Sequence, residues 1–68
     1  MGSVILPNAI VNTGTKVGVG CIVNLGAIVD HDCIIENGVH VCVGAIVKGN
    51  NVIGKCTKIE AGEIIERG

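Results

Sequence analysis

Two histidines with polar neighbours are the residues of this chain best suited to acid–base chemistry. Imidazole is the side chain that takes up and releases a proton near neutral pH. His31 is followed directly by Asp32, whose carboxylate can raise the basicity of the ring and fix its tautomer. We therefore expect this pair to remove a proton from an amine or hydroxyl nucleophile.

Both histidines lie within a six-residue repeat that runs along the chain. Starting at Ile5, every sixth residue is Val or Ile, eleven times in succession. The position two residues earlier is mostly small, and the position three residues later is Gly, Asn or Asp in nine of ten cases. Those three residue types tolerate a positive φ. The 11 glycines and many β-branched residues oppose a helix, and a period of six does not match the helical period of about 3.6.

Each six-residue unit predicts a strand of about four residues followed by a two-residue corner. A side of six residues cannot pair with the next side, so the chain has to coil until strands stack. Three sides give a coil of eighteen residues with a triangular cross-section. We expect an all-β domain over residues 1–68, a parallel β-helix of about three and a half coils. Its narrow interior would hold the Val and Ile positions together with Cys21 and Cys33, and it explains the absence of aromatic residues.

The eighteen-residue coil predicts where the polar residues lie. Gly49 follows His31 by one coil and shares its corner, where the N–H of a glycine could stabilise an oxyanion. His40 follows His31 by half a coil, which places it in the middle of the opposite face. Asn24 and Lys58 lie on that same face, respectively before and after His40. The two groups can combine only between subunits, as in a cyclic trimer of parallel prisms.

The segment from Asn24 to Gly49 carries the pattern N-x-x-A-x-[IV]-[DE]-H-[DE]-C and a second histidine nine residues after the first. It resembles the sugar acetyltransferases of the sialic-acid O-acetyltransferase and bacillosamine N-acetyltransferase type, within the hexapeptide-repeat acyltransferases. The resemblance implies a left-handed β-helix, acetyl-CoA as acyl donor, a sugar acceptor and a homotrimer. It also implies His31 as general base, Asp32 as the residue that orients it, Gly49 as oxyanion donor, and Asn24 and His40 as lining residues. Lys58 could then meet phosphates of coenzyme A.

Family members also carry an N-terminal α/β domain that binds the nucleotide of a nucleotide-sugar, and further coils. Neither is present in these 68 residues, so we expect a truncated copy, a fragment or a minimal homologue. The alternative is a trimerising structural module derived from such an enzyme and lacking activity. A γ-class carbonic anhydrase uses the same prism but needs three metal-binding histidines, whereas this chain has two.

Composition argues against other classes of partner. A net charge of −1 gives no electrostatic attraction to nucleic acid. The longest apolar stretch, residues 17–29, is interrupted by glycines and is too short to span a bilayer. The four cysteines form no C-x-x-C pair and no secretory signal is visible, so reduced thiols in a cytoplasmic protein are favoured over disulfides or a metal site. Because a small core without aromatic residues is marginal, we expect self-association to add stability.

Overall fold

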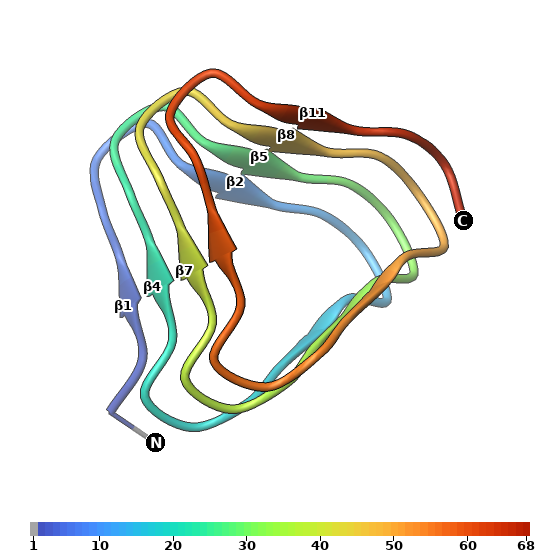
Figure 1. Ribbon diagram of the computed structural model, residues 1–68, viewed down its shortest axis with the longest axis horizontal. Coiled ribbons are helices and arrows are strands. Elements are labelled where there is room, and N and C mark those ends of the chain that lie inside the picture. Colours follow the sequence, from blue (N-terminus) through green and yellow to red (C-terminus); the bar gives the residue numbers. More distant parts are fainter. Residues whose placement is uncertain (1) are drawn as a thin grey trace.

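The computed structural model describes residues 2–68 as a triangular coil of short parallel strands (Figure 1). In chain order the strands are β1 (Val4–Ile5), β2 (Ile10–Val11), β3 (Lys16–Val17), β4 (Ile22–Val23), β5 (Ile28–Val29), β6 (Ile34–Ile35), β7 (His40–Val41), β8 (Ile46–Val47), β9 (Val52–Ile53), β10 (Lys58–Ile59) and β11 (Ile64–Ile65). Each strand spans two residues, but the backbone hydrogen bonds between coils include one further residue on each side, as in Val4 N–H to Cys21 O and Asn24 N–H to Val41 O. The hydrogen-bonded part of each side is therefore about as long as the four residues expected. No helix occurs in the described part of the chain.

The strands form three parallel sheets, which we call faces A, B and C. Face A consists of β1, β4, β7 and β10, face B of β2, β5, β8 and β11, and face C of β3, β6 and β9. Each strand from β1 to β8 pairs with the strand eighteen residues further on, as Val4 does with Ile22. With its C-terminal end nearer the viewer, the chain runs clockwise around the triangle (Figure 1), so the β-helix is left-handed. These observations confirm the parallel β-helix predicted from the repeat and the left-handedness that the resemblance implies.

The corners have the backbone conformation that the repeat predicts. Their second residue has a positive φ throughout: Asn8, Gly14, Gly20, Gly26, Asp32, Gly38, Gly44, Asn50, Cys56 and Gly62. Cys56, the one residue in this row that is not Gly, Asn or Asp, still adopts a φ of 59°. The geometry of the coil therefore overrides the preference of the residue at that corner.

The core is a column of small and β-branched side chains. Twelve apolar residues are buried, and they are Cys21, Val23, Ala27, Val29, Cys33, Ile35, Val39, Val41, Ala45, Val47, Ile53 and Ile59. Cys21 and Cys33 therefore pack inward, as expected, whereas Cys42 is half-buried and Cys56 is exposed. All four thiols are free.

Small inward residues also satisfy the carbonyl groups of the corners. Thr15 Oγ1 donates a hydrogen bond to the carbonyl of Asp30 at 2.5 Å, and Cys33 Sγ donates to that of Lys48 at 3.2 Å. The partners are fifteen residues apart, and the same spacing recurs for three other inward residues: Ser3, Cys21 and Asn51. At three of the four corners between faces A and B the inward residue is alanine, and at the fourth it is Glu63. The backbone N–H of this residue closes the turn, as Ala27 N–H does to Asn24 O at 3.1 Å.

Candidate active site

The His31–Asp32 pair lies at the corner between faces B and C, where the chain turns from β5 into β6. His31 Nδ1 and Asp32 Oδ2 are 3.1 Å apart, and 44% of the His31 side chain is accessible to solvent. A proton on Nδ1 is donated to the carboxylate, which leaves Nε2 as the ring atom able to accept a proton. The corner therefore presents an accessible base that its neighbour holds in one tautomer.

Asp30 fixes the backbone from which His31 projects. Its Oδ1 accepts a hydrogen bond from His31 N–H at 2.8 Å and another from Asn12 Nδ2 at 3.2 Å. Its own carbonyl accepts the hydroxyl of Thr15. Sequence reasoning had noted Asp32 but assigned no role to Asp30. The signal was an acidic residue directly before a corner, where its side chain can accept from the next backbone N–H.

Two glycines make room for the pair in the neighbouring coils. A Cβ on Gly49 would lie 2.7 Å from His31 Nε2, and a Cβ on Gly14 would collide with the carboxylate of Asp32. Gly14 has a positive φ, but Gly49 does not. The need for glycine at position 49 is therefore one of space, because the imidazole ring lies against it.

The N–H of Gly49 is free to donate a hydrogen bond. In the two preceding coils the equivalent N–H groups, those of Thr13 and His31, donate to the side chains of Asn12 and Asp30. Lys48 precedes Gly49 in the same way that Asn12 and Asp30 precede Thr13 and His31, but its side chain has no acceptor atom. Within residues 2–68 the Gly49 N–H has no hydrogen-bond partner. A free backbone donor thus lies beside the proton-accepting atom of His31, although Gly49 itself is largely covered by the ring.

A second polar group lies on face A. His40, in β7, faces outward, and its Nε2 is 3.4 Å from Asn24 Nδ2 in the coil before it. Both side chains are half-buried. Lys58, in β10, pairs in register with His40 one coil further on and is exposed.

One chain does not bring its two histidines together. His31 lies where faces B and C meet, and His40 lies on face A, across the prism from that corner. The structure therefore contains two separate groups. The first is His31 with Asp32 and Gly49, and the second is His40 with Asn24 and Lys58.

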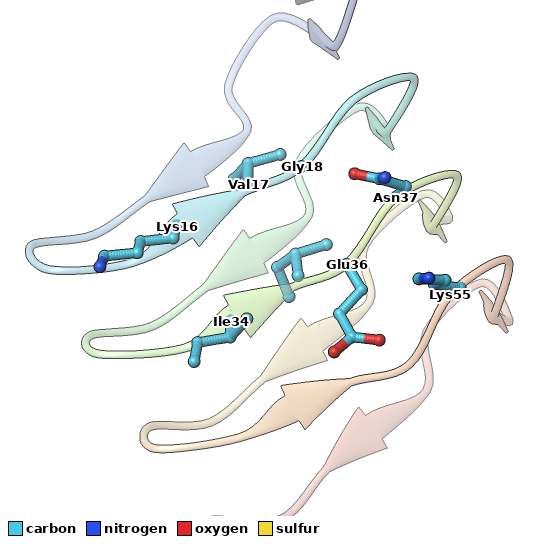
Figure 2. Close-up of a pocket in the computed structure, with 8 residues that line it drawn as sticks. Lys16, Val17, Gly18, Ile34, Glu36, Asn37 and Lys55 are labelled. Carbon is cyan, nitrogen blue, oxygen red and sulfur yellow. The ribbon is translucent and has the colours of Figure 1, made fainter.

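A shallow hollow of about 270 Å³ lies elsewhere, on face C (Figure 2). Lys16 and Lys55 lie at opposite ends of it, with Glu36 between them. Asn37 covers the backbone of Gly18 there, and its Oδ1 accepts a hydrogen bond from Val19 N–H at 2.8 Å. None of the predicted site residues lines the hollow.

Comparison of the chain with protein-family models, with curated proteins and with solved structures finds no match. Among residues 2–68, no group of three or more His, Cys, Asp and Glu side chains is placed to hold a metal ion. The same residues include no helix long and apolar enough to cross a membrane.

Proposed function

We propose that this chain is the catalytic β-helix of an acyltransferase that moves an acetyl group from acetyl-CoA to a hydroxyl or amino group of a sugar. The observation that carries the proposal is the corner at which His31, Asp32 and the free N–H of Gly49 lie together. The resemblance of residues 24–49 to the hexapeptide-repeat sugar acetyltransferases supports the choice of donor and acceptor.

The reaction needs only a base and an oxyanion donor. The acceptor's oxygen or nitrogen attacks the thioester carbonyl while His31 Nε2 takes its proton, and a new C–O or C–N bond forms. The oxyanion of the tetrahedral intermediate accepts a hydrogen bond from Gly49 N–H. The C–S bond then breaks, and the departing thiolate takes the proton from the imidazolium. Asp32 stabilises the imidazolium while it exists. No nucleophilic residue of the protein is required.

The second polar group would be supplied by a neighbouring subunit. A cyclic trimer of parallel prisms involves no shift along the prism axis, so residues with similar numbers lie at similar heights. Asp32 is eight residues after Asn24 and eight before His40. The corner pair of one subunit therefore lies at a height midway between Asn24 and His40 of the next. Lys58, one coil beyond His40, would meet the phosphates of coenzyme A.

Acetyl transfer to a panel of amino- and hydroxy-sugars, followed by mass spectrometry of the sugar, tests the proposal. We expect His31→Ala to lower the rate by about 10²–10⁴, the usual contribution of a general base, without dissociating the trimer. A trimeric wild-type protein that acetylates no acceptor and binds no coenzyme A would contradict the proposal.

That outcome would favour the second candidate, a trimerising module without catalytic activity. The observation in its favour is a row of outward isoleucines on face B, which would hold copies together without any contribution from His31. Bound coenzyme A distinguishes the two candidates, because a structural module has no need for it.

A further inference from the structure

Face B carries an unbroken row of isoleucines on its outer surface. They occupy the outward position of its four strands and stack in register from coil to coil. We call Ile10, Ile28, Ile46 and Ile64 the isoleucine ladder. The two at its ends are each 51% exposed, and the two in the middle are half-buried. A continuous apolar row on the outer surface of a small protein indicates a contact with another molecule.

The corner between faces A and B is also apolar along its full height. Its first residues in successive coils are Pro7, Leu25, Val43 and Ala61, which we call the apolar ridge. Leu25 and Val43 are about half exposed, at 47% and 48%. The equivalent residues at the other two corners are mostly polar: Thr13, His31, Gly49 and Arg67 at one, and Val19, Asn37 and Lys55 at the other.

Rotation by a third of a turn leaves the orientation of a regular triangle unchanged. In a cyclic trimer of parallel prisms no two flat faces can therefore lie flush, and each contact has to place a corner of one prism on a face of the next. The first residue of each strand, which is the ladder isoleucine on face B, includes His40 and Lys58 on face A and Lys16 on face C. Face B also carries Asp30, Lys48 and Glu66, but these follow its strands and lie toward the His31 corner, away from the corner between faces A and B. The ridge and the ladder are the corner and the face that can meet without burying a charge.

The ridge and the ladder also match in height. Each ladder residue follows the ridge residue of its coil by three positions, as Ile28 follows Leu25 and Ile46 follows Val43. Three residues are one sixth of a coil, which is a rise of about 0.8 Å when strands are about 4.8 Å apart. Two copies at the same level therefore set an apolar residue against an apolar residue in every coil.

We propose that the isoleucine ladder of one copy receives the apolar ridge of the next copy, and that three such contacts close a ring. The inference takes the cyclic trimer from the proposed function and adds which two surfaces hold it together. All three chains run in the same direction around their parallel prisms. Face A of one copy and the His31 corner of the next therefore form the two walls of a wedge-shaped cleft beside this contact. His31 is three residues from Ile28, and His40 is three residues from Val43, so each histidine lies about 10 Å from the contact.

Exchange of charges tests the contact directly. Ile28→Glu with Ile46→Glu puts acidic groups on the ladder, and Leu25→Lys with Val43→Lys puts basic groups on the ridge. We expect either pair alone to give a folded monomer in sedimentation velocity, since each buries charges against an apolar surface. Both pairs in one chain should restore the trimer, because each acidic ladder then meets the basic ridge of the next copy. The matched control, Ile34→Glu with Val52→Glu on exposed positions of face C, should remain trimeric.

Circular dichroism identifies charged variants that fail to fold. If they do, the milder variant Ile28→Ala with Ile46→Ala is measured in their place. It should raise the trimer dissociation constant at least tenfold while the β-sheet signal is retained. A ladder variant that stays trimeric, or folded single variants whose combination is not rescued, would overturn the contact. One contact that this result would leave open is that between two ladders. Combining the two pairs of substitutions would not rescue it, because its glutamates would still face glutamates. Because sedimentation does not depend on turnover, the two proposals can fail separately. A trimer that passes these tests but acetylates no acceptor and binds no coenzyme A would contradict the enzyme proposal and leave the contact standing.

Discussion

At the scale of single residues, the ring of His31 is held in place from several directions. Asp32 contacts Nδ1, Asp30 fixes the backbone N–H, and Gly49 leaves the space that the ring occupies. These three contacts come from side chains or gaps in two successive coils. The orientation of the base is therefore a property of the stacked coil and not of His31 alone.

Replacing Asp32 tests how much the carboxylate contributes. Asp32→Asn keeps the size of the side chain but removes the charge that stabilises the imidazolium. We expect acetyl transfer to slow, but by less than the about 10²–10⁴ expected for His31→Ala. Steady-state rates of the two variants give the comparison, and a loss for Asp32→Asn as large as that for His31→Ala would contradict a purely orienting and stabilising role.

Replacing Gly49 tests the space beside the ring. A methyl group at this position would lie 2.7 Å from Nε2 and would displace the imidazole. We expect Gly49→Ala to reduce acetyl transfer at least tenfold, with little change in the unfolding midpoint because the φ is not positive. Gly54→Ala is the matched control, since a Cβ there would meet no atom within 4 Å. Equal activities of the two variants would show that the ring does not need this space.

At the scale of the coil, the inward polar residues stabilise the corners as well as filling space. Their hydroxyl, thiol and amide groups donate to carbonyls fifteen residues further along. No buried side-chain nitrogen or oxygen atom among residues 2–68 is left without a partner. A corner thus depends on a residue in the preceding coil, which couples neighbouring coils beyond their strand pairing.

Thr15→Val tests this coupling. Valine keeps the shape of the side chain but leaves the Asp30 carbonyl without its donor, so we expect unfolding to become easier by about 1–3 kcal/mol. Urea unfolding at one fixed protein concentration measures the change. Thr13→Val is the control, because Thr13 is exposed at the corner and its side chain donates no hydrogen bond within the described chain. An equal loss in both variants would assign the effect to β-branching or to threonine in general.

The sequence was sufficient to predict these coils, but it was not sufficient to predict all of their bonds. A period of six with Val or Ile at every repeat has one compact solution, so the eighteen-residue stacking and the corner conformations followed from it. For Thr15 and Cys33 the repeat indicated only a small inward side chain, and Asn51 departs from that pattern. Which carbonyl each of them reaches depends on the path of a corner and could not be inferred. The same holds for Lys48, whose lack of an acceptor frees the Gly49 N–H.

At the scale of the whole molecule, the fold keeps the two polar groups of one chain apart and places its two apolar surfaces, the ridge and the ladder, side by side. His31 and His40 lie on opposite sides of the prism, while the ridge and the ladder lie on adjoining surfaces of one corner. Self-association through the apolar surfaces would bring the polar groups of different copies to the two walls of one cleft. On this account stability and catalysis depend on the same assembly.

Complementation between two inactive variants tests the shared site most directly. His31→Ala and His40→Ala chains would be unfolded together, refolded at equal concentration and shown by native mass spectrometry to form mixed trimers. Random mixing pairs an intact corner with an intact face in about one interface in four, so we predict recovery of about a quarter of wild-type activity. Mixed trimers that are no more active than either parent would show that the two histidines do not act across the interface, and would contradict the account.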